Sequence, residues 1–379
     1  MKILFTGGSS GGHFYPIIAV AEEVNAIVDE RSLVQPDLYY LAPSPYNDKV
    51  LYENELQYIK APAGKLRIYS SMSNVFDIIK TTFGSLKAIW LLFRIFPDVI
   101  FSKGSYASVP TIFAARILKI PYVIHDSDAI PGRANMWAAE KAERIGISYP
   151  EAIDHFPKNL QGKVALLGNP VRKEILHPES QGAHEYLGFS RDLPTLLILG
   201  GSQGAKTINE VVLEALPDLV ARYQIIHQTG EANIQEVKGT AAIVLENHRF
   251  AGRYQAHAYL DDLGLRMGAG AANLIISRAG SGAIFEIAAW KKPALLIPLS
   301  EEVSRDQRKN AFSAARLGGA VVIEEGNLSP HVFQAEIDRL MARPEHLEKM
   351  AESLNTLYRA NAARKIAEEL LAIALKHEA

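Results

Sequence analysis

Residues 1–16, MKILFTGGSSGGHFYP, decide the fold of this chain. Residues 2–6 form a short apolar run, which predicts a buried strand of a parallel sheet. Four glycines and two serines follow at positions 7–12, and a helical pattern of apolar residues begins at Ile17. Glycines let a ligand approach the backbone closely, and a helix N-terminus favours negative charge. The strand, loop and helix together predict an anion-binding site.

The loop matches neither the G-x-G-x-x-G of dinucleotide-binding proteins nor the Walker sequence G-x-x-x-x-G-K-[ST]. A tight strand-to-helix turn without a ligand is the alternative interpretation. His13 closes the loop beyond the carboxyl end of the strand. In this position His13 could take part in the chemistry of a binding site, or it could have only a structural role.

The composition limits the classes of protein to which this chain can belong. Its 379 residues predict two domains, and it has a formal net charge of −2 and no cysteine. The charge gives no sign of nucleic-acid binding. The lack of cysteine excludes disulfides, thiolate metal sites and cysteine nucleophiles, and it fits a reducing cytoplasm. We expect neither a secretory signal nor a membrane span, because no apolar run has the necessary length.

Strand-like runs alternate with helical patterns along the chain, which is typical of parallel sheets with helices on both faces. The predicted strands are 3–6, 38–42, 99–102, 122–125, 145–148, 164–167, 196–200, 224–228, 274–277, 294–298 and 320–324. The main predicted helices are 17–28, 75–96, 112–118, 133–142, 208–221, 283–289 and 307–317.

The series starts again halfway along the chain, where residues 196–205 read LLILGGSQGA and repeat the strand, glycine loop and helix. We therefore expect an α/β fold of two doubly wound Rossmann-like domains with an interdomain cleft, and ligands at the carboxyl ends of the strands. The first domain is expected to span residues 1–168 and the second 169–354. A helix over about residues 355–379 is expected to pack back on the first domain.

Three stretches of the second half carry candidate binding groups. Residues 200–205 offer backbone N–H groups and the Ser202 hydroxyl at a helix start, which suits a diphosphate. Glu286 lies one turn inside the next such helix and could accept hydrogen bonds from ribose hydroxyls. Asp306 and Gln307 could contact sugar hydroxyls in the same way. A structural turn, a solvent-facing glutamate and a capped helix start are the respective alternatives.

In the first half, residues 101–110 form a further glycine-containing turn after a strand, and residues 125–135 are rich in polar groups after another. Asp126, Asp128 and His13 are the candidates for a general base, which an inverting sugar transfer needs. Ion pairing or helix capping remains the alternative for each aspartate.

The predicted helix 75–96 carries a different pattern. Apolar residues recur at helical spacing, and basic residues lie beside that stripe every seven residues. The apolar set is Phe76, Ile79, Phe83, Leu86, Trp90 and Phe93, and the basic set is Lys80, Lys87 and Arg94. An apolar face bordered by cations suits an anionic bilayer surface. A core helix with a solvated edge is the alternative.

In this order, the motifs resemble those of the MurG family, the bacterial transferases that move N-acetylglucosamine (GlcNAc) from UDP-GlcNAc onto lipid I to make lipid II for peptidoglycan. The family's first loop, GG-T-GG-H-x-x-P, is similar to residues 8–16, and its GGY-x-S-G-P to residues 104–110. Its H-E-Q-N is similar to residues 125–128, where Asp128 replaces the asparagine. GNPVR and GGSQGA match in full as residues 168–172 and 200–205.

The resemblance implies roles for individual residues. It places Arg172 near phosphate, Ser202 on the diphosphate, Leu260 at the uracil, Glu286 on the ribose and Gln307 on the GlcNAc hydroxyls. The predicted substrate-binding residues are Ser10, Gly11, Gly12, Tyr106, Asp128, Asn135, Arg172, Ser202, Gln203, Leu260, Ser281, Gly282, Ala283, Ile284, Phe285, Glu286, Asp306 and Gln307.

The resemblance also implies a GT-B fold and an inverting transfer to the 4-hydroxyl of the muramyl sugar, without a metal or other cofactor. The partners are then UDP-GlcNAc, lipid I and the anionic cytoplasmic face of the plasma membrane, on which the protein lies peripherally. Alternatives are another GT-B enzyme that uses UDP-GlcNAc, such as a 2-epimerase or a glycolipid synthase, and a non-catalytic membrane adaptor. A nicotinamide dehydrogenase would need G-x-G-x-x-G, which opens neither half.

Overall fold

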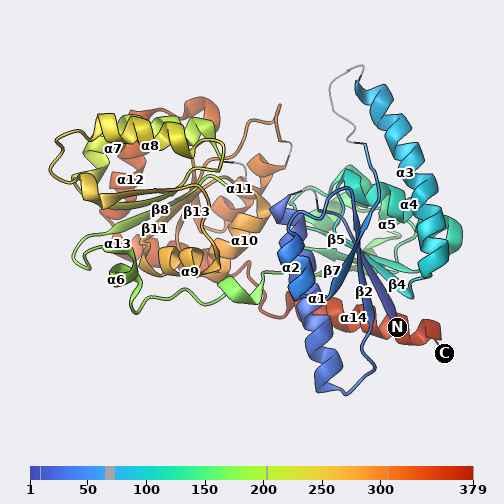
Figure 1. The fold of residues 1–379 in the computed structure, drawn as a ribbon. Helices are drawn as coiled ribbons and strands as arrows, with labels where there is room; N and C mark the ends of the chain where they lie inside the picture. Colours follow the sequence, from blue (N-terminus) through green and yellow to red (C-terminus); the bar gives the residue numbers. More distant parts are fainter. Residues whose placement is uncertain (9, 65–72, 202–203, 305, 379) are drawn as a thin grey trace. The chain divides into compact units, whose positions relative to one another are not determined.

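The structure, a computed structural model, describes residues 1–8, 10–64, 73–201, 204–304 and 306–378. The chain forms two compact units (Figure 1). Unit 1 consists of residues 1–172 and 359–379, and unit 2 of residues 173–358. Each unit has its own parallel sheet and its own hydrophobic core.

Unit 1 is built on a seven-stranded sheet in the order β3-β2-β1-β4-β5-β6-β7, and all its strand pairs are parallel. The strands are β1 Lys2–Thr6, β2 Asp37–Ala42, β3 Leu56–Lys60, β4 Val99–Ser102, β5 Tyr122–Asp126, β6 Arg144–Ile147 and β7 Val164–Leu166. The chain runs outward from β1 through β3 and then returns to the other side of β1 with β4. The ends of β1 and β4 therefore form a topological switch point, where doubly wound sheets bind ligands.

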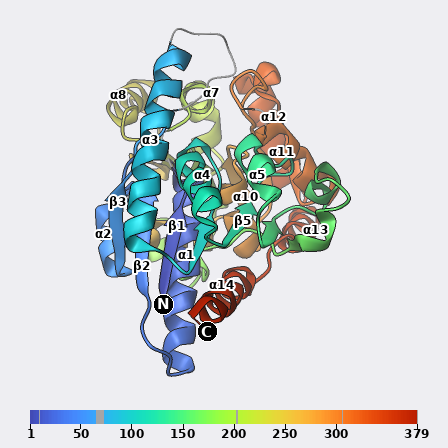
Figure 2. The ribbon, with the colours of Figure 1, turned by 90° about the vertical axis from the view of Figure 1, so that its right-hand side faces the viewer.

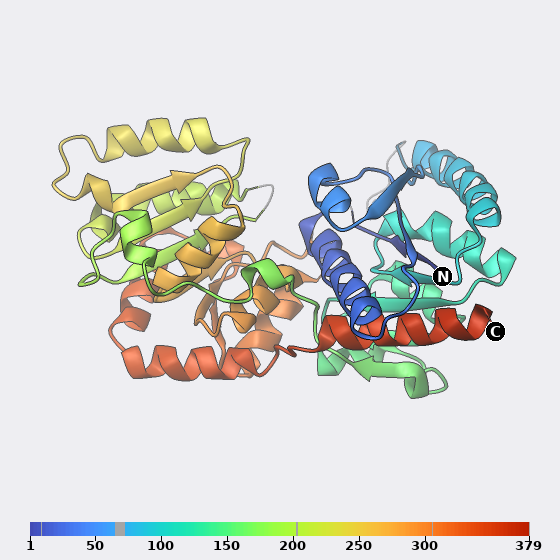
Figure 3. The ribbon, with the colours of Figure 1, turned by 60° about the horizontal axis from the view of Figure 1, so that its bottom comes forward.

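Helices cover both faces of this sheet. They are α1 Gly11–Glu30, α2 Asp48–Glu53, α3 Ser73–Ile95, α4 Val109–Leu118, α5 Arg133–Ala139 and α14 Ala362–Glu378. Ile3 and Phe5 of β1 pack with α1 and α14, whereas Leu4 packs with α3 and α4, because successive side chains of a strand point to opposite faces. Figure 3 shows α14 beside α1, and Figure 2 shows α3 beside α4.

Unit 2 repeats the plan with a six-stranded parallel sheet in the order β10-β9-β8-β11-β12-β13. The strands are β8 Thr195–Leu199, β9 Gln224–Gln228, β10 Tyr254–His257, β11 Leu274–Ser277, β12 Ala294–Leu296 and β13 Ala320–Val322. The helices are α6 Ala183–Leu187, α7 Lys206–Val220, α8 Ile234–Val244, α9 Asp262–Ala271, α10 Ser281–Ala289, α11 Gln307–Arg316, α12 Pro330–Met341 and α13 Pro344–Asn355. The switch point lies between β8 and β11.

The two doubly wound parallel sheets confirm the predicted fold class. Continuous apolar runs such as residues 195–199 form strands that are buried on both faces, as parallel sheets require. The sequence did not reveal β3 and β10. Both are outer strands of their sheets and only partly buried, so neither has a continuous apolar run.

The start of the first helix also differs from the prediction. We expected a loop through Gly12 and a helix from Ile17, but α1 begins at Gly11 and contains Pro16. Phe14 is fully buried and packs against the rings of Tyr40 and Tyr46. This packing holds the glycine-rich segment in a helix despite its low intrinsic helix propensity. Within the described ranges, none of the helices is long and apolar enough to cross a bilayer.

Candidate functional site

In unit 1, the first glycine loop lies beside the end of β4. Gly7 and Gly8 have φ values of +117° and +84°, which side chains rarely adopt. A Cβ on Gly7 would lie 3.0 Å from the carbonyl oxygen of Gly104, so the two loops approach at backbone distance. The Tyr40 hydroxyl lies 2.8 Å from the Gly7 oxygen and 3.0 Å from the Gly8 oxygen. These contacts fix the loop just before α1, where the first N–H groups of a helix have no acceptor within the helix.

His13 lies in the first turn of α1 rather than in a loop. Its Nδ1 atom is buried and has no hydrogen-bond partner among the described residues. Burial, reinforced by the nearby Lys103 cation, lowers the pKa of His13 to about 4, although a hydrogen bond to the Lys103 backbone opposes the shift. His13 is therefore neutral at pH 7 and can accept a proton.

No site role was predicted for Lys103. It follows β4 directly and is only 1% exposed. Its Nζ atom lies 2.5 Å from His125 Nδ1, 2.5 Å from Ser127 Oγ and 2.8 Å from Asn169 Oδ1. Burial lowers the pKa of Lys103 to about 7. A lysine at the first position beyond a buried strand was the signal that could have revealed it.

His125, at the end of β5, is fully buried. Its Nε2 atom lies 2.9 Å from the Gly168 carbonyl oxygen, which can only accept a hydrogen bond. Nε2 therefore carries the proton, and Nδ1 accepts from Lys103. Burial, together with the Lys103 charge, keeps the pKa of His125 well below its ordinary value.

Asp126 organises the polar segment after β5. Its Oδ1 atom accepts from the Asp128 N–H at 3.0 Å, and its Oδ2 atom accepts from the Gly132 N–H at 2.9 Å and from Asn135 Nδ2 at 2.8 Å. Asp126 and Asn135 are buried, whereas Asp128 is partly exposed. The Asp126 carboxylate thus holds the segment from 126 to 135 in one conformation.

Two more predicted residues of unit 1 lie on turns after strands. Tyr106 begins a 3₁₀ turn, Tyr106–Ser108, directly after Ser105, which has a φ of +71°. Arg172 is 6% exposed, and its guanidinium carbon lies 3.9 Å from the ring centroid of Tyr15. Tyr15, which was not among the predicted residues, therefore orients Arg172.

In unit 2, the second glycine loop is tied to the residue at the expected uracil position. Gln228, at the end of β9, donates to the Gly201 oxygen at 3.2 Å and accepts from the Leu260 N–H at 3.0 Å. Gly204 has a φ of +77°, and a Cβ there would meet the Thr229 oxygen at 2.3 Å. Ser202 and Gln203 lie outside the described residues.

The other predicted residues of unit 2 lie at the starts of α10 and α11. Ser281, Ile284 and Phe285 are buried, and the Ile284 N–H donates to the Gly280 oxygen at 3.1 Å. Gly282, Ala283 and Glu286 are partly exposed. Asp306 precedes α11, and the Gln307 Oε1 atom accepts from the Leu299 N–H at 3.1 Å.

Helix N-termini gather on the carboxyl side of the unit 2 sheet. Helices α7, α9, α10 and α11 begin after β8, β10, β11 and β12 respectively. A helix N-terminus carries about half a positive charge and N–H groups that lack an acceptor within the helix, although at α9 the Asp261 side chain accepts from the Gly264 N–H. This edge is suited to phosphate. In the described part of the chain, no group of three or more His, Asp and Glu side chains is arranged to hold a metal ion.

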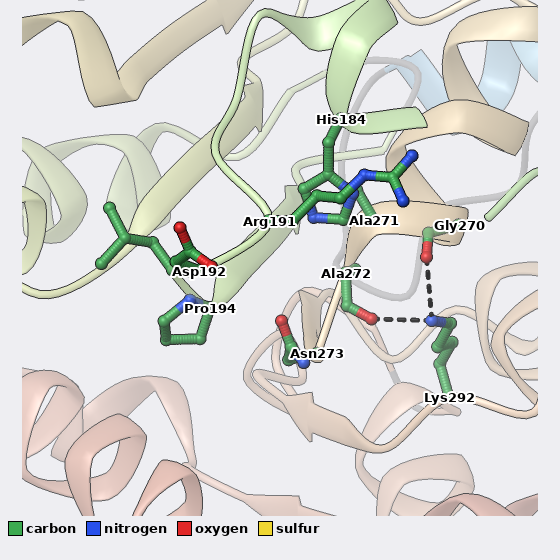
Figure 4. A pocket seen from close by; sticks show the side chains of 10 residues that line it. His184, Arg191, Asp192, Pro194, Gly270, Ala271, Ala272, Asn273 and Lys292 are labelled. Carbon is green, nitrogen blue, oxygen red and sulfur yellow. Dashed lines mark hydrogen bonds between the residues drawn. The ribbon is translucent and has the colours of Figure 1, made fainter. Parts of the chain in front are cut away.

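A pocket of about 290 Å³ lies at the opposite edge of this sheet (Figure 4). Pro194, Asn273 and Lys292 line it, and they precede β8, β11 and β12. Lys292 donates to the carbonyl oxygens of Gly270 and Ala272 at 3.3 and 2.8 Å. The pocket contains none of the predicted site residues.

Comparisons with known proteins cover both units. Residues 3–147 match the glycosyltransferase family 28 N-terminal domain, and residues 195–370 match its C-terminal domain. The chain is 37% identical to a UDP-N-acetylglucosamine--N-acetylmuramyl-(pentapeptide) pyrophosphoryl-undecaprenol N-acetylglucosamine transferase of Bacillus thuringiensis, over 94% of each chain. It is also 37% identical to the protein of that name from Shouchella clausii, over 97% of this chain and 98% of the relative.

Two solved structures show the same fold. The crystal structure of Acinetobacter baumannii MurG superimposes with a TM-score of 0.72 at 22% identity, over 98% of this chain and 99% of the other. UDP-GlcNAc 2-epimerase from Neisseria meningitidis bound to UDP-GlcNAc superimposes with a TM-score of 0.69 at 17% identity, over 98% and 100%.

Proposed function

Because the chain belongs to the MurG family of N-acetylglucosaminyltransferases, we propose that it transfers GlcNAc from UDP-GlcNAc to lipid I and so makes lipid II for peptidoglycan. The observation that carries this proposal is 37% identity to a transferase of that name over 94% of both chains. The likeness to a 2-epimerase is one of fold only, at 17% identity, so the epimerase alternative is not favoured.

We propose that unit 2 binds UDP-GlcNAc at the carboxyl edge of its sheet. The glycine loop and the N-terminus of α7 would hold the diphosphate through backbone N–H groups. Leu260, kept in place by Gln228, would contact the uracil. Glu286, partly exposed in α10, would accept hydrogen bonds from the ribose hydroxyls, and Gln307 would donate from Nε2 to the sugar.

We further propose that unit 1 takes the acceptor and that His13 is the general base. The acceptor 4-hydroxyl oxygen attacks C1 of GlcNAc, its proton passes to the neutral imidazole of His13, and the C1–O bond to UDP breaks. The choice of His13 rests on its neutral ring and its unpartnered Nδ1 in the described structure. Asp126 already accepts three hydrogen bonds, which supports a role in holding the loop.

The charge that develops on the departing diphosphate is stabilised by dipoles that are oriented before the reaction. Backbone N–H groups at helix N-termini need no reorganisation, and such groups contribute several kcal/mol each, roughly 3–4 in measured oxyanion sites. Arg172, whose guanidinium carbon lies 3.9 Å from the Tyr15 ring centroid, would add a planar donor for phosphate.

We also propose that the protein docks on the cytoplasmic membrane face through α3. Phe83, Leu86, Trp90 and Phe93 are 56–68% exposed on one face of this helix, and we call them the apolar stripe. Lys87 and Arg94 are exposed beside the stripe. Phe113 and Ile117 are exposed on α4, which packs against α3. The side chains of Phe76, Ile79 and Lys80 lie outside the described part.

An aromatic stripe bordered by cations matches the interface of an anionic bilayer. Its exposure counts against the alternative that the helix buries this face in the core. Both this docking and the residue roles above remain predictions.

The transferase activity is tested with radiolabelled UDP-GlcNAc and lipid I in detergent micelles. Label in the butanol-soluble lipid fraction, dependent on added lipid I, is the expected result. Formation of labelled UDP-N-acetylmannosamine, or of free N-acetylmannosamine after hydrolysis, without lipid I would instead identify a 2-epimerase. Label in neither product would contradict the proposal.

A further inference from the structure

We propose that Lys103 is a positioning residue of the transfer reaction. Its buried ammonium group ties the ends of β4 and β5 to the Gly168–Arg172 turn. It thereby keeps His13 in place and unprotonated. The inference rests on the transferase function proposed above, and it concerns a residue for which neither the motifs nor the family comparison predicted a role.

The donors of the Lys103 ammonium group match the acceptors around it in number. An ammonium group has three N–H donors and no acceptor. Three acceptors surround Nζ: His125 Nδ1, Ser127 Oγ and Asn169 Oδ1, at 2.5, 2.5 and 2.8 Å. The Ser127 hydroxyl hydrogen is used elsewhere, because this group donates to Asn169 at 3.2 Å. The ammonium form supplies one N–H donor for each of these three acceptors.

These three bonds join parts of the chain that are far apart in sequence. His125 and Ser127 belong to the segment after β5, and Asn169 lies 66 residues beyond Lys103 in the turn that also carries Arg172. His125 adds a second link to this turn through the Gly168 oxygen. Loss of the ammonium group would therefore loosen two segments that bear proposed site residues.

The backbone at Lys103 reaches the other side of the site. Lys103 N donates to the Thr6 oxygen at the end of β1, and the Lys103 backbone hydrogen-bonds to His13. One residue therefore connects the first glycine loop, the base and the 168–172 turn. Lys103 is enclosed in protein at 1% exposure and does not itself reach the substrate.

The charge of Lys103 has a separate effect from its hydrogen bonds. The titratable groups that interact with it are His13 on α1, His125 on β5, and Asp126 and Asp128 beyond β5. The two aspartates favour the ammonium form, whereas the ammonium disfavours a second cation on either histidine. Lys103 thus helps to keep His13 unprotonated, which is the state a base needs before it accepts the acceptor proton.

The test compares two lysines that are both buried in large part and both donate to protein acceptors. Lys103→Met removes the ammonium at nearly constant volume. Lys292→Met does the same in unit 2, where the Lys292 ammonium donates to the carbonyl groups of Gly270 and Ala272. Kinetics with radiolabelled UDP-GlcNAc and lipid I are measured for each variant from pH 4 to pH 9, together with thermal unfolding.

We expect Lys103→Met to lower kcat about 100-fold, because a shift of the catalytic groups by ~1 Å has an effect of this size. The KM for UDP-GlcNAc should stay unchanged. We also expect the acid limb of its kcat/KM profile to move to higher pH, because His13 loses the repulsion by the ammonium. Lys292→Met should lower the melting temperature and leave kcat and the acid limb as in the wild type. A Lys103→Met protein that loses stability alone, with normal kcat and an unmoved limb, would overturn the inference.

A second measurement keeps the inference testable if Lys103→Met does not fold. Nitrogen NMR of ¹⁵N-histidine-labelled wild-type protein should show His125 protonated at Nε2 with Nδ1 as a hydrogen-bond acceptor. A proton on Nδ1 would exclude donation from Lys103 and overturn the inference. The NMR measurement does not depend on catalytic activity. A wild-type protein that transfers no GlcNAc would refute the proposed function, and the NMR spectrum would still test the hydrogen bonds of Lys103.

Discussion

Gly104 lies so close to Asn135 that a Cβ atom on Gly104 would stand 2.6 Å from the Asn135 side-chain nitrogen. Gly104 also has a φ of +79°, a conformation that strains residues with side chains. The backbone after β4 and the polar segment after β5 are therefore in direct contact.

We expect Gly104→Ala to lower the free energy of unfolding of unit 1 by at least about 1–3 kcal/mol, from backbone strain and displacement of Asn135. Gly162→Ala is the matched control in unit 1, because no atom lies within 4 Å of its Cβ position and its φ is not positive. Urea unfolding of both variants measures the difference. If the two variants were equally stable, the Asn135 side chain would move aside for the new Cβ atom at little cost in free energy.

His13→Ala should lower kcat about 10²- to 10⁴-fold, the usual contribution of a general base, with little change in KM for UDP-GlcNAc. Initial rates at varied UDP-GlcNAc and lipid I measure both constants. His155→Ala, at an exposed position of unit 1, is the control. A His13→Ala enzyme with normal kcat would remove this residue from the mechanism and direct attention to Asp128.

Gln228→Ala should raise KM for UDP-GlcNAc and leave the acceptor KM unchanged, because it removes the bonds to the Gly201 oxygen and the Leu260 N–H. Loss of two neutral hydrogen bonds of about 1 kcal/mol each predicts a roughly tenfold or larger effect. Calorimetric titration with UDP gives the affinity directly. The Gln255→Ala variant, which removes a bond to the Leu187 oxygen, serves as a control in the same unit.

Stability should fall in mild acid because of His227. This fully buried side chain is held between Tyr254 and Asn209, and burial lowers its pKa to about 3. The unfolded chain binds a proton near pH 6.5, but the folded chain does not, so folding loses stability as the pH falls below 6.5. At pH 5 the loss from this group is about 2 kcal/mol.

The measurement is urea unfolding of unit 2 at pH 7 and pH 5. The His227→Gln variant keeps a donor and an acceptor but cannot titrate, so its stability should change less between the two pH values. An equal change in both proteins would locate the acid sensitivity elsewhere.

The apolar stripe can be tested with vesicles. The double variant Trp90→Ser and Phe93→Ser should lose most of its co-sedimentation with phosphatidylglycerol vesicles, because it removes two aromatic anchors. Ile243→Ser removes a side chain that is 74% exposed on unit 2 and should bind as the wild type does.

The cations are tested separately. Lys87→Glu with Arg94→Glu should weaken binding to phosphatidylglycerol but not to phosphatidylcholine, and added salt should reduce the difference. Unchanged binding in both double variants would show that α3 is not the docking surface.

Much of this protein could be predicted from local patterns. The conformation of a glycine loop depends on a few neighbouring residues, and so does the apolar pattern of a strand or helix. The sequence by itself therefore indicated both glycine loops and the alternation of strands and helices. The ordered motifs then predicted the family. The outer strands β3 and β10 escaped prediction because their partly buried side chains form no continuous apolar run.

The surroundings of Lys103 were decided by the tertiary structure alone. Its three acceptors come from segments 22 to 66 residues away, and they meet only because parallel strands bring the ends of β4 and β5 to one edge. The sequence determined which residues follow each strand. Which of them are buried together, and therefore which charges and protonation states they hold, depends on the order of the strands in the sheet, because burial and proximity set these properties.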